Sequence, residues 1–508
     1  MGHCLRRLGV IACLTVPSRV GAQLPPVGVP AGVIRVDLGG SLESFDDRFR
    51  DGHRESYAAD LASGALGSDR IPALADADAR IARIIGDAGY RTNLGALTAE
   101  AHADVGRGYL GLGLGLTNRI TIFGRLPLVD ARVQPRVGLN PAGANAGINP
   151  GAGAQAPFFS EFDAALATLS ANIANGTYSG TQRDLAIATL AQGTALRTDL
   201  FGLLADPITA SSFVPVASSP AGTAVETQVE SLQNTLASDL GVSGFSSGPA
   251  LPGEALTQSD LTTFFGTTLG LHLNDQRVTF RGDGEAGVAL TLVNRWDRGT
   301  HRGGFRAALS GLARFPTGRR DRTDHPLDIG TGEGHTDLQL DLVADLGAGP
   351  LGARLTGTYV RQLPSDIPVR VTAPGQPFVG TDRLTFVRRD PGDVVAIGVK
   401  PFYRLARTFA IQAGLEHWSR TSDAVSYASP ADEIVGLDPN VLSEETSASA
   451  TVLSAGVTIA NPGRLTRGGT GMPVDASWSY ERVIQAGGGR VPDSHLMRGQ
   501  LRLYFGLW

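Results

Sequence analysis

Apolar and polar residues alternate with a period of two through many segments of this chain. From Leu338 to Leu346 every even position is leucine or alanine, whereas the odd positions from 337 to 345 are mostly aspartate or glutamine. Strict alternation is the signature of a β-strand with two chemically different faces. An amphipathic helix would repeat its apolar residues at steps of three and four. The pattern therefore predicts strands.

The alternation predicts about twelve strands, within a range of roughly 10 to 14. They cover residues 33–46, 98–116, 119–133, 277–296, 302–316, 335–346, 350–363, 393–405, 408–419, 447–460, 473–484 and 496–508. Short turns alternate with long loops, the long ones being 47–97, 134–276, 317–334, 364–392 and 420–446. This asymmetry is typical of outer-membrane proteins. We expect an all-β protein, a transmembrane antiparallel up-and-down β-barrel.

The polar faces of neighbouring predicted strands carry charges of opposite sign. Because isolated charges inside a barrel are costly, we expect them to pair across the lumen wall. Two interpretations remain open: the pairs fill and stiffen the lumen, or they line a permeation path. The lumen-lining candidates are Arg306, Arg314, Asp337, Asp341, Lys400, Glu416, Glu481, Arg498 and Arg502.

Residues 134–276 break the strand pattern and predict a helical insertion at the extracellular mouth. Phe162, Leu166, Leu169 and Ile173 recur at steps of three and four, as apolar residues do on one face of a helix. A second such stretch contains Val225, Val229, Leu232 and Leu236. Further helical stretches are predicted near 185–196 and 256–271. The segment 71–85, in the first long loop, is amphipathic as well. Three interpretations of these helices remain open. They form an apolar groove for cargo, a small bundle that buries its own apolar faces, or a recognition module.

Composition narrows the class of protein. The 508 residues have a mean hydropathy of +0.00 and no run near the roughly 18 apolar residues of a membrane helix, which excludes a helical membrane protein. A net charge of −5 argues against nucleic acid as a partner. Arg6 and Arg7 precede an apolar stretch and a small-residue site ending at Ala22, which predicts a signal peptide over 1–22. The first barrel strands then occupy 23–133 and the remaining ones 277–508.

Candidate catalytic and metal motifs are weak. The segment Gly244–Gly248 fits a nucleophile-elbow spacing but lies in a Gly/Ser/Pro loop, not in a strand-turn-helix. The loop residues Asp321, Asp324, Asp328 and Glu333 are spaced for a divalent cation or are simply solvated, and we favour solvated charge. We expect no catalytic residues, no cofactor and no metal, and hence not an enzyme.

Several short segments resemble a known family. They are Gly115–Ile122 with Pro127, Phe315–Gly318, Gly330–Gly334 leading into Asp337 and Leu338, and Arg389–Asp393. These segments are similar to the transporter family associated with aromatic meta-cleavage pathways, related to FadL-type channels. The chain also ends in Trp508, as barrels of this class end in an aromatic residue, although its apolar alternation runs one residue out of phase.

The resemblance implies a place in the cell outer membrane of a Gram-negative-type bacterium. It implies contact with outer-membrane lipid, recognition of the C-terminal strand by the barrel-assembly machinery, and passive passage of small hydrophobic molecules through a channel. It carries over no binding residues. The alternative is an outer-membrane-anchored binding or structural protein, a receptor or adhesin, that displays the helical insertion.

Overall fold

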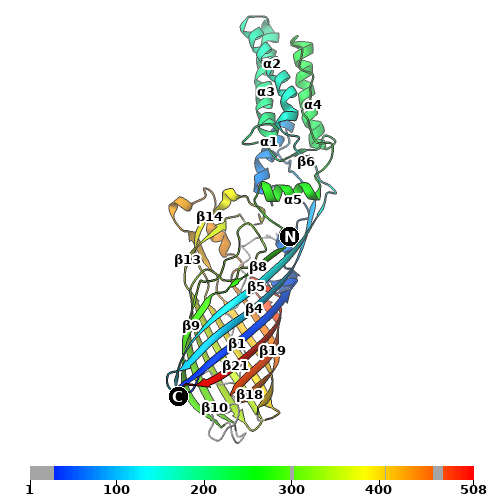
Figure 1. Cartoon of the computed structure of the whole chain (residues 1–508). Coiled ribbons are helices and arrows are strands. Elements are labelled where there is room, and N and C mark those ends of the chain that lie inside the picture. The colour runs from blue at the N-terminus through cyan, green and yellow to red at the C-terminus, as the bar shows by residue number, and fades with distance from the viewer. Residues whose placement is uncertain (1–27, 298–302, 374, 407, 462–472, 508) are drawn as a thin grey trace.

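The chain forms a closed antiparallel β-barrel of twelve strands, seen in a computed structural model that describes residues 28–297, 303–373, 375–406, 408–461 and 473–507 (Figure 1). The predicted signal peptide, 1–22, falls outside these residues. Each strand pairs with its neighbours along the chain, and β1 closes the ring by pairing with the last strand. The barrel strands are β1 (Val33–Phe45), β4 (Ala96–Gly115), β5 (Ile120–Asn140), β9 (Gly284–Asp297), β10 (Gly303–Phe315), β11 (Asp337–Ala348), β12 (Leu351–Gln362), β15 (Val394–Arg404), β16 (Phe409–Arg420), β18 (Ala448–Asn461), β19 (Val474–Gly487) and β21 (His495–Gly506). The predicted fold class is confirmed.

Two predicted boundaries fall inside strands. β5 continues to Asn140, past the predicted start of the insertion at 134, and the predicted strand 277–296 is split into β8 (Gln276–Arg281) and β9. Leu128 pairs with Arg281, and Arg125 pairs with Glu285. Between these two pairs β5 moves three residues along the chain, whereas the facing segment moves four. The extra residue makes a bulge beside a proline, Pro127, which has no backbone N–H to pair.

The barrel has an apolar outer face and a polar inner face. On β11 the side chains of Leu338, Leu340 and Leu342 are 46%, 48% and 47% exposed, whereas the intervening Asp337 and Asp341 are buried. An apolar band of this kind faces lipid in outer-membrane barrels. The alternation predicted from the sequence is confirmed on β11.

None of the helices in the described ranges is long and apolar enough to span a membrane.

The two rims differ, as predicted. β1 begins and β21 ends at the rim that carries the short turns, including 116–119 and 349–350. The opposite rim carries the long loops, the small sheet β2 (Asp47–Arg50), β3 (His53–Ser56) and β20 (Arg490–Pro492), and the sheet β13 (Ser365–Arg370), β14 (Leu384–Asp390) and β17 (Ala424–Tyr427). Short helical turns in these loops are η1 (Ala59–Leu61), η2 (Pro72–Leu74), η4 (Thr381–Arg383), η5 (Pro430–Asp432) and η6 (Pro439–Ser443).

Four helices form a bundle that stands above the long-loop rim (Figure 1). They are α1 (Ala75–Ile85) from the first long loop, α2 (Ala152–Ala174), α3 (Gly180–Leu204) and α4 (Pro220–Asn234), which continues into η3 (Thr235–Asp239). The bundle has a core of its own that includes Ile81, Phe158, Phe162, Leu200, Leu203, Val225 and Val229. The strands β6 (Ala146–Ile148) and β7 (Phe213–Pro215) pair beneath it. Of the three interpretations of the insertion, this packing matches the bundle that buries its own faces.

A separate apolar core covers the barrel mouth between the rim and the bundle. The helix α5 (Gln258–Thr267) contributes Leu261, Phe264 and Phe265 to this core rather than to the bundle. The loops contribute Tyr57, Leu61, Ile71, Ile329 and Phe378. Four long loops and the upper ends of β4 and β5 are therefore joined into one cap, which holds the loops over the lumen.

Candidate functional site

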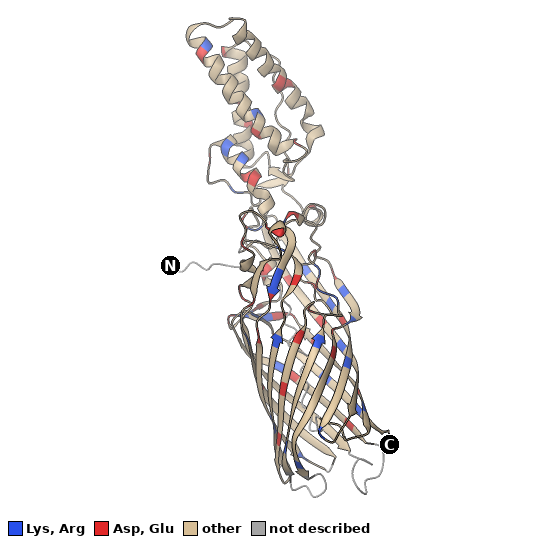
Figure 2. Cartoon of the chain, turned by 90° about the vertical axis from the view of Figure 1, so that its left-hand side faces the viewer, with Lys and Arg blue, Asp and Glu red and all other residues tan. Residues whose placement is uncertain are grey.

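A row of polar residues climbs the inner wall across nine adjacent strands, and charged positions recur along the barrel strands in Figure 2. Each member lies directly opposite the next in the strand register. We call it the ascending row, and it consists of Asp475, Arg502, Asp37, Gly111, Arg125, Glu285, Arg314, Asp337 and Gln362. Acids and arginines alternate along most of it, so each charge has an opposite charge as its neighbour.

The ascending row is held by ion pairs. Arg502 Nε lies 3.2 Å from Asp37 Oδ1 near the short-turn rim. Near the long-loop rim, Arg314 bridges two acids, with 3.2 Å from Nη2 to Glu285 Oε1 and 2.5 Å from Nη1 to Asp337 Oδ2. These side chains are at most a tenth exposed, so the pairs are shielded from bulk solvent.

Gly111 is the one member of the row without a side chain. A Cβ at this position would lie 3.1 Å from both Asp37 Cβ and Arg125 Cγ. The glycine therefore leaves room for the two charged side chains on either side of it. Along β4 the buried glycines Gly111, Gly113 and Gly115 alternate with the outward-facing leucines Leu110, Leu112 and Leu114.

A second row crosses the wall nearer the short-turn rim. Arg306, Asp345, Arg354 and Lys400 face one another in register on β10, β11, β12 and β15. Asp345 lies between two arginines, 2.5 Å from Arg306 Nε and 2.6 Å from Arg354 Nε. Lys400 Nζ in turn lies 3.8 Å from Glu416 Oε2. The second row and the lower end of the ascending row together place charged side chains across the part of the lumen near the short-turn rim.

All nine lumen-lining candidates have their side chains on the inner face. Arg314, Asp337 and Arg502 belong to the ascending row, and Arg306 and Lys400 to the second row. Glu481 pairs with Arg498 at 3.8 Å, Glu416 with Lys400, and Asp341 accepts hydrogen bonds from Gln339 and Thr358. Whether they line a permeation path stays a prediction.

Of the nine members of the ascending row, only Arg314, Asp337 and Arg502 were predicted to line the lumen. Asp37 pairs with Arg35 on its own strand, and Arg125 has no charged neighbour two residues away, so neither shows the pattern of opposite charges on consecutive strands. Glu285 follows the bulge in the predicted strand. The extra residue in the bulge decides whether the Glu285 side chain faces the lumen or the lipid, and the alternation in the sequence does not reveal it.

A cavity of about 210 Å³ lies in the upper lumen, beside the upper members of the ascending row. One side carries the apolar residues Trp418, Val452, Val483, Val491, Pro492 and Leu496, together with the charged Glu481 and Arg498. The other side is charged, with Arg125, Asp283, Glu285, Arg314 and Glu333. Of the nine candidates, only Arg314, Glu481 and Arg498 are among its lining residues. The cavity thus offers apolar contacts on one side and charged groups on both.

The wall beside this cavity is thin along one line. Gly499, Gly40 and Gly108 lie opposite one another on β21, β1 and β4, and they face outward. A groove of about 600 Å³ follows them on the outer surface, bounded by Trp478 and Leu128. The groove and the cavity share Gly40, Ser41, Arg107, Gly108, Val129 and Arg498, so little more than backbone separates them there. The strand pairing is continuous across this line.

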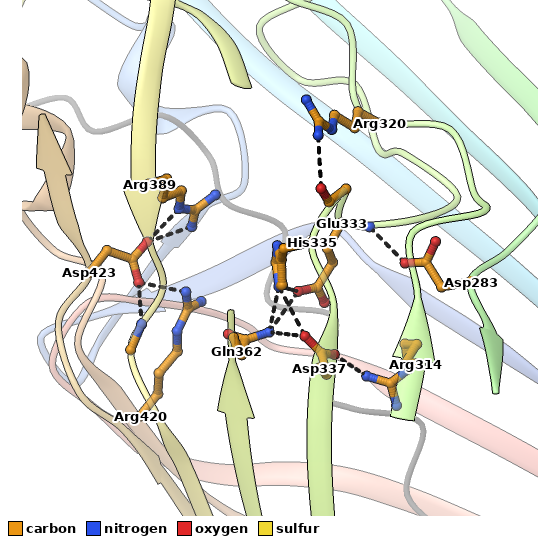
Figure 3. A network of polar contacts seen from close by, with 12 residues as sticks. Asp283, Arg314, Arg320, Glu333, His335, Asp337, Gln362, Arg389, Arg420 and Asp423 are labelled. Carbon is orange, nitrogen blue, oxygen red and sulfur yellow. Dashed lines mark hydrogen bonds and ion pairs between the residues drawn. The ribbon is translucent and has the colours of Figure 1, made fainter. Parts of the chain in front are cut away.

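The ascending row ends in a cluster of four side chains at the top of the lumen (Figure 3). Glu333 and His335 lie in the loop that leads into β11, Asp337 is the first residue of β11, and Gln362 projects toward them from β12. His335 Nε2 lies 2.9 Å from Glu333 Oε2 and 3.2 Å from Asp337 Oδ1. Burial alone would lower the pKa of His335, but the hydrogen bonds to Asp337 and Glu333 outweigh it and raise that pKa to about 9.

The other motifs do not assemble a site. In the acidic loop, Asp324 pairs with Arg322 and His325, and Asp328 accepts a hydrogen bond from the Arg322 backbone N–H. Of the four loop acids named from the sequence, Glu333 is the one that joins the cluster. The Gly244–Gly248 segment has neither a preceding strand nor a following helix. Its Ser247 hydroxyl donates to Glu161 on α2 at 2.8 Å, which ties the segment to the bundle.

A buried carboxylate links the loops at the mouth. Asp60 pairs with Arg48 at 2.7 Å and Arg490 at 2.8 Å, and it also contacts Arg50. Burial alone would raise the pKa of Asp60, but the three arginines outweigh it and hold that pKa below its ordinary value. Arg490 pairs in addition with Glu445 at 2.7 Å. This network joins three of the long-loop-rim segments.

Comparison with known proteins found similar solved structures. No family model matches the chain, and no curated protein matches it in sequence. An outer-membrane channel from Pseudomonas putida F1 is 10% identical with a TM-score of 0.43, covering 95% of this chain and 100% of the other. The CymD monoaromatic hydrocarbon channel is 9% identical with a TM-score of 0.26, covering 94% and 89%. The translocator domain of NalP from Neisseria meningitidis is 8% identical with a TM-score of 0.30, covering 94% and 90%.

The closed barrel, the apolar outer band and the unequal rims are those of a cell outer-membrane protein.

Proposed function

We propose that this protein is an outer-membrane channel for passive passage of small, hydrophobic molecules. The observation that carries the proposal is a cavity of about 210 Å³ with apolar lining residues inside a closed, lipid-facing barrel. A small molecule with an apolar body finds apolar contacts there. The family resemblance of the sequence segments points the same way.

The cavity lining suits molecules with an apolar body. Trp418, Val452 and Val483 offer apolar contact on one side, so a hydrophobic solute can leave water there. The charged residues on the other side are already paired with each other and gain nothing from an apolar solute. The proposed cargo therefore moves along the apolar side.

The second row disfavours an axial route for such cargo. An apolar molecule moving toward the short-turn rim would have to displace buried ion pairs such as Arg306–Asp345, which costs several kcal/mol. The glycine line Gly499–Gly40–Gly108 offers a shorter way to the outer groove and the bilayer. We infer that cargo leaves sideways there, after local separation of the strands.

The orientation follows from the general rule for these barrels. Their short turns and both ends of the barrel face the periplasm, and their long loops face the exterior. The cap, the cavity mouth and the helical bundle then face outside, where cargo arrives.

Flux through a membrane that resists hydrophobic solutes tests the proposal. The chain would be placed in an asymmetric bilayer with lipopolysaccharide in its outer leaflet, and the influx of N-phenylnaphthylamine followed by fluorescence. We expect influx well above that of bilayers holding a closed barrel of similar size. Equal influx in the two preparations would refute the channel.

A second candidate function rests on the bundle. Its self-contained core and its place above the rim suit a module displayed on a membrane anchor, as in a receptor or adhesin. In that case removal of residues 149–212, whose flanking residues Ile148 and Phe213 are paired in register, would abolish surface binding. Dye influx would be absent before and after the removal.

A further inference from the structure

The cluster at the top of the lumen converges on one point. Gln362 Nε2 lies 2.8 Å from His335 Nε2, 3.0 Å from Glu333 Oε2 and 3.3 Å from Asp337 Oδ1 (Figure 3). His335, Asp337 and Gln362 are at most 5% exposed. Three groups with metal-binding atoms therefore surround the position that the glutamine amide nitrogen occupies.

The protons of this cluster do not satisfy every contact. If His335 Nε2 carries a proton, it donates to the two carboxylates but faces the Gln362 N–H group at 2.8 Å, donor against donor. If Nε2 carries a lone pair, it accepts from Gln362 but faces both carboxylate oxygens. A cation makes the contacts of His335, Glu333 and Asp337 favourable, because their nitrogen and oxygen lone pairs then point at positive charge. The Gln362 amide must turn so that its oxygen replaces its N–H group at the site.

The spacing of the ligand atoms fits a transition metal. Bonds of about 2.0–2.2 Å in a tetrahedral zinc site place the ligand atoms roughly 3.4 Å apart. Here the histidine nitrogen is 2.9 Å and 3.2 Å from the two carboxylate oxygens, and all three atoms lie within 4.8 Å of one another. The two nitrogen–oxygen distances lie within about half an ångström of that tetrahedral spacing.

Outer contacts fix the cluster in place. Arg314 binds the second oxygen of Asp337, which leaves Oδ1 directed at the cluster. The Glu333 backbone N–H donates to Asp283, and Arg320 donates to the carbonyl of Gly334, so the segment between the ligands is held as well (Figure 3). Metal sites use such surrounding hydrogen bonds to orient their ligands.

We propose that Glu333, His335 and Asp337 bind a divalent transition-metal cation, with Gln362 turning its amide oxygen toward the ion. One imidazole nitrogen and carboxylate oxygens are ligands that Zn²⁺ accepts, whereas Ca²⁺ takes oxygen ligands only. The ion reaches the site from the lumen cavity, which Glu333 lines. This site differs from the acidic loop considered in the sequence and departs from the expectation of no metal.

Calorimetric titration with Zn²⁺ tests the proposal on the full chain in detergent after chelator treatment. We expect one ion per chain, and at least tenfold weaker binding in both His335→Gln and Glu333→Gln. The matched control is His102→Gln, because His102 also contacts two acids, Asp46 at 2.8 Å and Asp104 at 3.1 Å, but through opposite ring nitrogens. That variant should bind Zn²⁺ like the wild type.

A gain of affinity guards against variants that simply misfold. Gln362→Glu adds a carboxylate at the site and should bind Zn²⁺ more tightly than the wild type. Absence of Zn²⁺ binding by the wild type would overturn the assignment. So would unchanged affinity in His335→Gln and Glu333→Gln, or weaker binding by Gln362→Glu.

Discussion

Val452 and Leu453 are chain neighbours on β18 with opposite surroundings: Val452 lines the lumen cavity, and Leu453 is 49% exposed on the lipid-facing surface. A tryptophan at 452 would fill part of the cavity. We expect Val452→Trp to lower dye influx at least fivefold and Leu453→Trp to leave it within twofold, measured at equal barrel content. Equal loss in both variants would show that the cavity is not the route.

The glycine line makes a separate prediction about the exit. A Cβ at Gly108 or Gly499 meets nothing within 4 Å, so the strands accept a larger side chain that would block the outer groove. Gly108→Leu with Gly499→Leu should reduce dye influx severalfold. Gly357 is also outward-facing with free space around it, and Gly357→Leu is the control on the far side of the barrel. Undiminished influx in the double variant would favour an axial exit.

Asp345 is expected to be a main stabilising group of the second row. Asp345→Asn leaves Arg306 and Arg354 buried without their acid, which should cost about 3–5 kcal/mol of unfolding free energy. Asp390→Asn, in a pair that is 40–41% exposed, should cost less than about 1 kcal/mol. Urea unfolding in lipid vesicles compares the two, and similar losses would contradict the burial argument.

The cap should loosen in acid because of Asp60. Its pKa is lower in the folded protein than the ordinary value of 3.8, so its stabilisation is complete above about pH 4 and is lost as the pH falls through the depressed folded value. Amide hydrogen exchange in residues 57–74, corrected for intrinsic rates, should speed up in that range. Asp60→Asn should exchange fast already at pH 6, whereas the exposed Asp382→Asn should match the wild type. Slow exchange in Asp60→Asn at pH 6 would be evidence against this role.

The helical bundle is expected to unfold independently, while the barrel stays folded. Phe162 is fully buried and stacks on Phe245 with ring centroids 4.6 Å apart. Phe162→Ala should cost about 3–5 kcal/mol and make α2 and α3 sensitive to protease. The heat-modifiable gel mobility of the barrel should not change. Ile187→Ala, 43% exposed on α3, should leave the bundle resistant, and a barrel that lost its mobility shift in Phe162→Ala would disprove independence.

The barrel could be predicted because lipid and lumen impose a two-residue period on each strand. Leu338 and Asp341 reveal their faces without any knowledge of the neighbouring strands. The break at Gly282–Asp283 could not be predicted, since a bulge depends on what the facing strand does at Pro127. For the same reason the predicted boundaries at 134 and 277 fall inside strands.

The site was predicted only in part. Opposite charges on consecutive strands revealed pairs such as Arg498 with Glu481, because neighbours in sequence are neighbours in the barrel. Glu333, His335 and Asp337 stand two residues apart, but the chain bends at Gly334, where φ is +79°, so the alternation of a regular strand does not explain how they come together. The approach of Gln362 depends on strand register, which the sequence pattern leaves open.

The ascending row also bears on how the barrel is assembled. Strands rich in glycine and leucine tolerate sliding, and a slip of one residue would turn an inner arginine toward the bilayer, at about 2–4 kcal/mol near its middle. A slip of two residues would keep the faces but separate every acid from its arginine. Since the row crosses nine strands, a strand inside it has a row member on each neighbouring strand. A slip of that strand therefore loses the register of the row on both of its edges. The row thus selects one stagger among those that a twelve-stranded ring permits.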